Sequence, residues 1–250
     1  MNDMNQNQPP LAPVGGQTSP PHPLPSDDPA DREPINGVMS AIESILRQPR
    51  RVLYALRQPG AWRIIIAMLF MAIVCMLIYG VVVGTFSRGD QLWIAPVKMV
   101  VGLLISALIC LPSLYIFGCL SGSRAQLSEM VGLVAGVLLL MTLLLIGFAP
   151  VAWLFSESTN SICWMGTLHL TFWCIATAFG LRFLGAGFKA TQARSQSGLY
   201  VWAIIFVLVA LQMTTALRPL LGNADTFLPV EKKFFLKHWA DCAEPLKSSP

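Results

Sequence analysis

The sequence predicts an all-α fold, a polytopic membrane protein with a bundle of five transmembrane helices preceded by an amphipathic interfacial helix. Two observations carry this prediction. Of the 250 residues, 54% are hydrophobic and only 12% are charged, whereas soluble domains carry about 25% charged residues. Residues 64–217 also contain five long stretches without any Asp, Glu, Lys or Arg. A chain with such a middle section does not stay dissolved in water.

Each uncharged stretch has the length of a membrane-spanning helix. Roughly 20 apolar residues cross the hydrocarbon core, and a helix satisfies every backbone polar group within its own segment. The transmembrane domain is predicted at residues 61–218, with spans at about 64–84, 99–120, 130–155, 162–181 and 199–217. Pro112 and Pro150 lie inside spans two and three, where each is expected to kink its helix.

The segment before the first span has two parts. Residues 1–34 are polar and rich in proline, a composition that predicts a disordered cytoplasmic tail. Residues 35–58 carry apolar residues at helical spacing, with Pro49 expected to break or kink the pattern. They predict an amphipathic juxtamembrane helix, which either lies on the membrane surface or packs on the protein's own loops. Its basic residues are expected to contact lipid head groups: Arg47, Arg50, Arg51 and Arg57.

The distribution of basic residues predicts the orientation. Arginines are abundant before the first span, whereas the loop TFSRGDQ after it holds only Arg88 and the loop near ESTN holds none. The positive-inside rule then puts the N-terminus in the cytoplasm, and five crossings put residues 219–250 outside. The absence of N-x-[ST] sites fits a bacterial inner membrane. Tryptophans, whose rings favour the interface, lie near the predicted span ends: Trp62, Trp93, Trp153, Trp164 and Trp202.

Polar residues inside the spans are the candidate functional groups, because burial in lipid is expensive for them. His169 is the ionisable residue deep in a span, apart from tyrosines, and is expected to form a hydrogen bond with a neighbouring helix. Gln212, Ser106 and Ser113 are expected to link helices through hydrogen bonds of about 0.6 kcal/mol each. A ligand contact of His169 is the less favoured alternative, and catalysis is less favoured still.

Gly132 and Gly136 form a GxxxG pair within the third span. Such a pair lets two helix backbones approach closely. Packing within the chain is favoured over dimerisation.

Several motifs that would indicate an enzyme are missing. The sequence has no HExxH, no GxSxG and no Walker GxxxxGK[ST]. The six cysteines form no CxxC pair and are expected to behave as small hydrophobes. We therefore expect no enzymatic activity, no metal or other cofactor, and no nucleic-acid partner.

One stretch suggests a family. The residues LPSLYIFGCLSGSRAQLSEMVGLVAGVLLLMTLLLIGFAPVAWLFS resemble the second and third spans of bacterial relatives of the Yip1-type membrane proteins. The resemblance covers roughly residues 40–220 and implies a cytoplasmic polar tail, five spans and a translocated C-terminus. Eukaryotic members of that family are associated with membrane trafficking and Rab-type GTPases. The resemblance assigns no functional residue in this sequence.

These observations predict a non-enzymatic scaffold or adaptor of a membrane complex. Its partners would be the lipid bilayer and a membrane or cytoplasmic protein. One alternative is a permease-like subunit that needs a separate energising partner, for which a cavity between spans two, three and four would be favourable. Another is an intramembrane hydrolase, which would have to pair Ser106 or Ser113 with His169.

Overall fold

The computed structural model describes residues 35, 37–58, 60–87, 91–123, 126–158, 162–190 and 197–216. Within these ranges all regular secondary structure is α-helix, and no strand occurs. The helices are α1 (Val38–Arg47), α2 (Pro49–Ala55), α3 (Ala61–Ser87), α4 (Gln91–Leu120), α5 (Leu127–Ser158), α6 (Ile162–Ala190) and α7 (Ser197–Ala216). The predicted disordered tail at 1–34 and the predicted C-terminal tail at 219–250 lie outside the described residues.

Four of the described helices, α3 to α6, are long and apolar enough to cross a membrane. This length and composition identify the chain as a multi-pass membrane protein. The described side chains of α7 cover a shorter apolar stretch, Ser197–Met213. All four long helices extend past the predicted spans, since α3 runs from Ala61 to Ser87, α4 begins at Gln91, α5 runs from Leu127 to Ser158 and α6 continues to Ala190. A helix does not have to end where the hydrocarbon ends, because its backbone bonds are internal in either medium.

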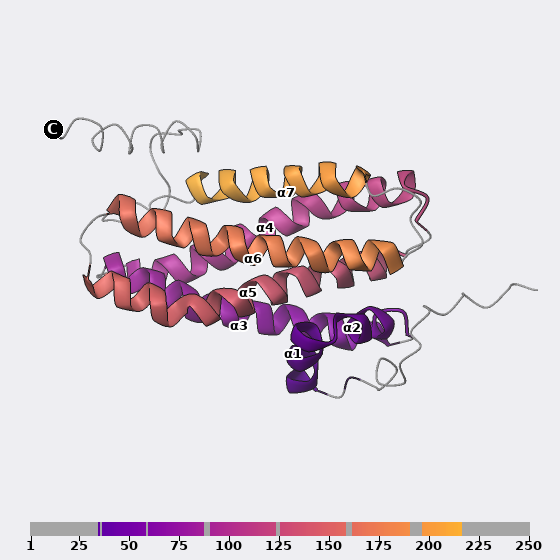
Figure 1. Cartoon of the computed structure of the whole chain (residues 1–250), viewed down its shortest axis with the longest axis horizontal. Coiled ribbons are helices and arrows are strands. Elements are labelled where there is room, and N and C mark those ends of the chain that lie inside the picture. The colour runs from indigo at the N-terminus through magenta and orange to yellow at the C-terminus, as the bar shows by residue number, and fades with distance from the viewer. Residues whose placement is uncertain are drawn as a thin grey trace, which may run out of the picture.

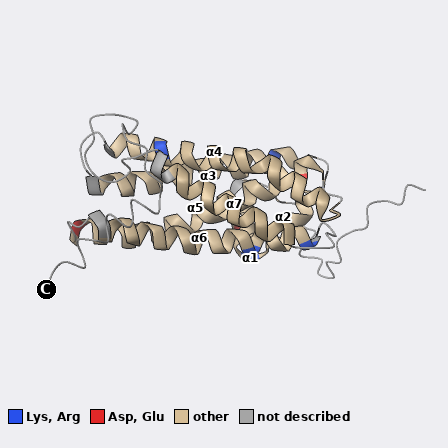
Figure 2. Cartoon of the chain, turned by 90° about the horizontal axis from the view of Figure 1, so that it is seen from above, with Lys and Arg blue, Asp and Glu red and all other residues tan. Residues whose placement is uncertain are grey.

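Helix α5 is the most buried of the four long helices. It packs against α3 on one side and α6 on the other, while α4 packs against α3 and α7 packs against α4 (Figure 1). Every residue of α5 from Gly132 to Thr142 is buried. Large apolar side chains on the other helices point outward, as a lipid-facing surface requires: Ile66, Phe70, Leu108 and Ile204 are all exposed. Few charged residues lie along the helices (Figure 2).

Two glycines bring neighbouring helices close together. A Cβ atom on Gly80 of α3 would lie 2.5 Å from Cα of Pro96 in α4. A Cβ on Gly198 of α7 would lie 2.9 Å from Oγ of Ser121 and 3.3 Å from the carbonyl oxygen of Phe117, both next to the end of α4. Only glycine allows these backbone approaches without displacement.

Trp202 departs from the interfacial position predicted for it. Its indole is buried between α7 and α4, and Nε1 donates a hydrogen bond to the carbonyl oxygen of Cys110 at 2.7 Å. The ring also stacks on Phe206. A buried indole N–H needs a hydrogen-bond acceptor, and the neighbouring helix supplies one here. The ring can therefore pack against that helix instead of contacting lipid head groups. The other four tryptophans are exposed near helix ends, as predicted.

The predicted helix at residues 35–58 is two helices, with the break at Pro49 that the sequence indicates. Gln48 adopts φ −133° and ψ 65° between them, and Pro49 is the first residue of α2. Proline has no backbone N–H and clashes with the preceding turn, so α1 ends before it. Gly37 and Gly60 flank the pair with φ of 91° and 94°, a region that residues with a Cβ rarely adopt.

The α1–α2 pair packs against the bundle near one end of the long helices (Figure 1). Ile45, Leu53 and Leu56 are buried there. The sequence predicts that this segment lies on the membrane surface or packs on the protein's own loops. In the structure it packs against the long apolar helices themselves.

Candidate functional site

The candidate site lies where α3 and α6 exchange a hydrogen bond. The hydroxyl of Tyr79 and Nδ1 of His169 are 2.8 Å apart, and the two rings meet edge-on with centroids 5.7 Å apart. Tyr79 stands eight residues before the end of α3, and His169 stands seven residues after the start of α6. Helix α5 packs against both of these helices, and the buried residues in its second half include the small Ala149 and Ala152.

This hydrogen bond leaves one nitrogen of His169 without a partner among the described residues. Nε2 is buried and accepts or donates no hydrogen bond there. A neutral imidazole has one donor and one acceptor nitrogen, so either tautomer leaves one group unsatisfied. Such a buried group costs about 1–3 kcal/mol. The expected contact of His169 with a neighbouring helix is therefore present, with Tyr79 as the partner.

Lys98 is a third polar residue in the same part of the bundle. Its side chain is 1% exposed, and it shares the buried side of α4 with Ala95, Gly102 and Ser106 at helical spacing. The contact between Gly80 and Pro96 brings this turn of α4 level with Tyr79 of α3. Lysines within membrane helices are rare and mark functional positions. We refer to Tyr79, Lys98 and His169 as the polar layer.

The sequence reasoning missed two members of this layer. Lys98 lies just outside the predicted span at 99–120, although the apolar residues Leu92, Trp93 and Ile94 before it indicate that the helix starts earlier. Tyr79 was missed because tyrosines were left out of the candidate ionisable residues. Hydropathy alone does not reveal which tyrosine faces which histidine.

The two serines of α4 form hydrogen bonds within their own helix instead of linking helices. Ser106 Oγ donates to the carbonyl oxygen of Gly102 at 2.7 Å, and Ser113 Oγ donates to that of Cys110 at 2.8 Å. Neither hydroxyl is bonded to His169, whose Nδ1 faces Tyr79. The nucleophile–base pair that an intramembrane hydrolase would require is therefore not assembled among these residues. Gln212 lies exposed near the end of α7.

The glycine pair of α5 receives side chains from three other helices. A Cβ on Gly132 would lie 2.5 Å from Cδ2 of Leu56, and one on Gly136 would lie 2.5 Å from Cε1 of Phe183. Ile45 of α1 also reaches Gly136, with Cδ1 3.6 Å from the same position. The two glycines thus lie at contacts within the chain, with side chains filling the space above them.

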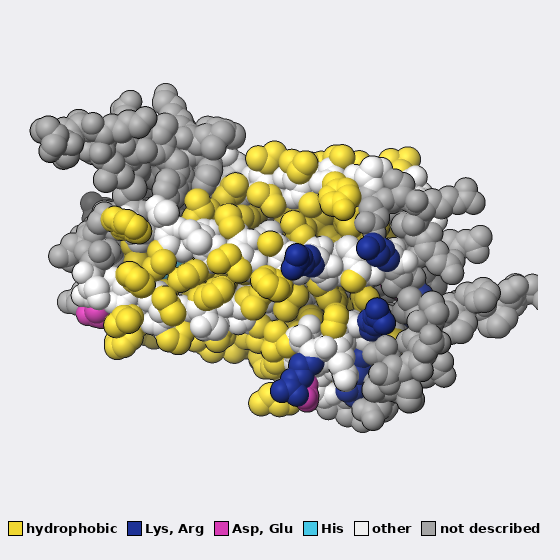
Figure 3. Space-filling view, viewed as in Figure 1, with side chains coloured by type: hydrophobic (Ala, Val, Ile, Leu, Met, Phe, Trp, Pro, Cys, Tyr) yellow, Lys and Arg dark blue, Asp and Glu magenta, His cyan; other side chains and the backbone are white. Residues whose placement is uncertain are grey.

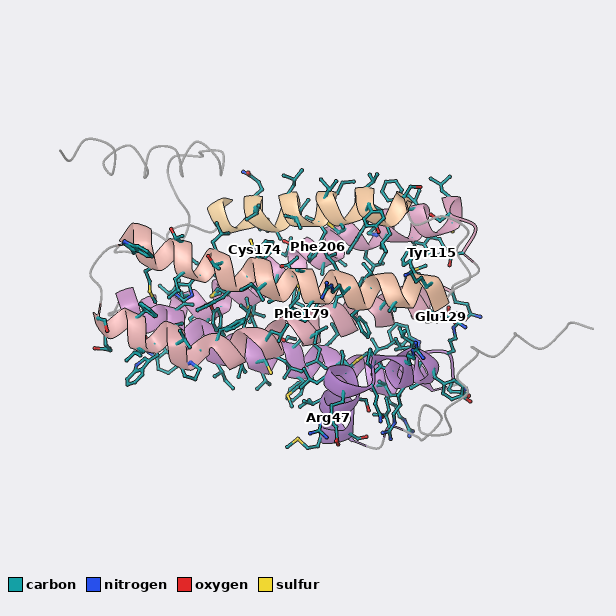
Figure 4. The ribbon with its side chains drawn as sticks, in the orientation of Figure 1. Arg47, Tyr115, Glu129, Cys174, Phe179 and Phe206 are labelled. Atoms are coloured by element: carbon teal, nitrogen blue, oxygen red, sulfur yellow. The ribbon has the colours of Figure 1, made fainter. Side chains whose placement is uncertain are left out.

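The basic residues of α1 and α2 differ in their surroundings. Arg47 and Arg50 are exposed, and Arg47 pairs with Glu43 at 3.4 Å. Arg51 and Arg57 are half-buried, and Arg57 lies 3.8 Å from Glu129 of α5. Figure 4 shows Arg47 on the side of α1 that faces away from the bundle.

Two further basic residues belong to the same end of the molecule. Arg182 and Lys189 are exposed in the second half of α6. Figure 3 shows that basic side chains gather where α1, α2 and this half of α6 lie, while hydrophobic side chains cover much of the remaining visible face.

No group of three or more His, Cys, Asp or Glu residues that would hold a metal ion occurs in the described ranges. Four cysteines there are free, with Cys75 and Cys110 buried and Cys119 and Cys174 exposed.

Comparison with protein-family models, curated proteins and solved structures finds no match to this chain.

Proposed function

We propose that the protein is a non-enzymatic, five-span scaffold or adaptor of a membrane complex, similar to the Yip1-type proteins. In this proposal α3 to α7 cross a bacterial inner membrane, with the N-terminus in the cytoplasm and the C-terminus outside. Helix α7 has 20 residues, or about 30 Å at 1.5 Å per residue, enough to cross the hydrocarbon core. Its exposed Val201, Ile204 and Leu208 suit contact with lipid.

The observation that carries the proposal is the dense apolar packing around α5. The buried run from Gly132 to Thr142 leaves the first half of α5 enclosed by its neighbours. Side chains occupy the space above its glycines, and Met141 of α5 in turn lies 3.0 Å from where a Cβ of Gly180 would be. A core filled in this way suits a protein that holds partners in place and offers no open path for a solute.

The proposed orientation is supported by the placement of charge. Basic side chains gather toward the end of the bundle that carries α1 and α2 (Figure 3). Arg47, Arg50, Arg182 and Lys189 are exposed on α1, α2 and the second half of α6. Glu157 lies at the opposite end of α5. Basic residues are enriched on the cytoplasmic side of membrane proteins.

The experiment that tests the scaffold proposal combines two assays on the full-length protein. Affinity purification in mild detergent, followed by identification of bound chains, is expected to return a stoichiometric protein partner. The same protein alone in liposomes is expected to leave the leak of ions and small solutes unchanged. Solute movement by the protein alone would contradict the proposal, and so would purification without any stoichiometric partner.

The permease-like subunit is the second candidate, and the polar layer favours it. Tyr79, Lys98 and His169 place ionisable groups within helices whose buried side chains are mostly apolar. Such residues commonly line transport paths. An Ala149→Cys change in a background without other cysteines tests this candidate. Labelling by a small, charged thiol reagent from outside would indicate a water-filled path along the second half of α5, whereas protection from the reagent would count against one.

A further inference from the structure

Helix α1 presents apolar side chains on two opposite sides. Ala41 and Ile45 are buried against the bundle. Met39 and Leu46, seven positions apart and therefore on one side of the helix, are 80% and 51% exposed on the other. Arg47 follows Leu46 on this outward side. An outward mixture of apolar and basic side chains is typical of helices that lie in the interface of a bilayer.

Helix α6 presents a similar mixture beyond its uncharged part. Arg182 and Lys189 are also seven positions apart, so both project from one side of α6. The guanidinium of Arg182 lies over the ring of Phe179, 5.9 Å from its centroid. Phe179 is itself 47% exposed.

The two helices meet at a single residue of α5. The position of a Cβ on Gly136 is 2.5 Å from the ring of Phe183 and 3.6 Å from Cδ1 of Ile45. Phe183 is the residue after Arg182, and Ile45 is two residues before Arg47. The outward side of α1 and the basic side of α6 therefore lie at a similar height along the bundle, and Figure 3 shows basic side chains over both elements on one face.

In the proposed arrangement, the uncharged stretch of α6 sets the edge of the hydrocarbon core at this height. The stretch of α6 from Ile162 to Leu181 contains no charged residue, and its 20 residues span about 30 Å, the thickness of that core. Arg182 is the first charged residue after it, and in the proposed arrangement it lies where the hydrocarbon core meets the lipid phosphates. A lysine or arginine at this position extends toward the head groups.

We infer that α1 and the second half of α6 together form a binding surface for the head groups of anionic phospholipids. In this surface Arg47 and Arg182 contact the lipid phosphate, while Met39, Leu46 and Phe179 contact the upper part of the acyl chains. The inference rests on the proposed orientation, which puts this end in the cytoplasmic leaflet. Arg57 does not belong to this surface, although the sequence predicts that it contacts lipid head groups, because it is half-buried beside Glu129. Charge complementarity favours an anionic lipid over a neutral one.

Native mass spectrometry of the full-length protein in detergent tests this inference. Phosphatidylglycerol is expected to bind more tightly than phosphatidylcholine at equal concentration. Arg47→Gln and Arg182→Gln are each expected to weaken phosphatidylglycerol binding about fivefold, with no change for phosphatidylcholine. Equal binding of the two lipids to the unchanged protein would overturn the inference.

Arg63→Gln is the matched control, because Arg63 is an exposed arginine near the start of α3 at the same end of the molecule. It is expected to keep the preference for phosphatidylglycerol. An equal loss in all three variants would show that net charge alone attracts the lipid, which contradicts a defined surface. Displacement of the bound lipid by millimolar inorganic phosphate would identify a free anion as the ligand and would also overturn the inference.

Hydrogen exchange in nanodiscs separates a lipid from an acidic protein segment as the occupant. Adding phosphatidylglycerol to phosphatidylcholine nanodiscs is expected to slow amide exchange in residues 38–47, and 0.5 M salt is expected to reverse part of the effect. Unchanged exchange would contradict lipid binding and leave an acidic partner segment as the occupant. Reporter fusions that put the N-terminus outside would instead refute the proposed orientation, so the two failures are distinguishable.

Discussion

The indole Nε1 of Trp202 in α7 donates a hydrogen bond to the carbonyl oxygen of Cys110 in α4, with 2.7 Å between the two atoms. This bond joins residues 92 positions apart in the sequence. It fixes α7 to the bundle at a point where both helices are apolar, so α7 is an integral part of the helical domain. A substitution that removes this bond therefore tests how α7 packs against α4.

Trp202→Phe is expected to destabilise the protein by about 0.5–1.5 kcal/mol. The ring is replaced by a smaller one and the donor is lost, but the carbonyl of Cys110 keeps a hydrogen bond from Ser113. Thermal unfolding in detergent measures the change. Trp93→Phe serves as the control, because Trp93 is exposed. An equal shift in both variants would argue against the buried contact.

Tyr79→Phe is expected to destabilise the protein by about 1–3 kcal/mol, because the change leaves both nitrogens of His169 without a described partner. Tyr115→Phe, which removes an exposed hydroxyl from α4, is expected to have little effect. The two variants are compared by denaturant unfolding in detergent.

A double-mutant cycle sharpens the same prediction. If Tyr79 and His169 act as a pair, Tyr79→Phe should cost less in a His169→Leu background than alone. Additive costs in the cycle would mean that the hydrogen bond between α3 and α6 contributes no free energy to folding.

Gly136→Ala is expected to destabilise the protein by about 1–3 kcal/mol. The added methyl group would lie within 2.5 Å of the Phe183 ring, which is buried and has little room to move. Gly147→Ala in the same helix is the matched control, since nothing lies within 4 Å of its Cβ position. There the better helix propensity of alanine is expected to give unchanged or slightly higher stability. Equal effects of the two changes on unfolding would show that α5 is not packed as described.

The long uncharged stretches were sufficient to predict where α3 to α6 lie. Each is long enough to cross the hydrocarbon core, and only a helix pairs all of its backbone polar groups within one segment. They were not sufficient to predict which side of each helix faces protein. Trp202 and Phe70 are both large apolar residues, yet Trp202 is buried against α4 and Phe70 faces outward. In a membrane both surroundings are apolar, so the contrast that reveals a core in a water-soluble protein is missing.

The candidate site was predictable only in part for the same reason. His169 stood out as an ionisable residue deep in an apolar stretch, and the structure gives it Tyr79 as its partner. Lys98 was hidden because helix α4 extends to Gln91, well before the stretch without charges begins. The break at Pro49 followed from the missing backbone donor of proline, but the packing of α1 and α2 onto α5 depends on long-range contacts with Gly132 and Gly136.

The number of crossings is the central claim, and one pair of reporter fusions tests it most directly. A reporter that is active only in the cytoplasm would be joined to Met1, and one that is active only outside would be joined to Pro250. Five crossings predict activity of both fusions. An inactive C-terminal reporter, combined with an active N-terminal one, would place both ends in the cytoplasm and would contradict α7 as a membrane-spanning helix.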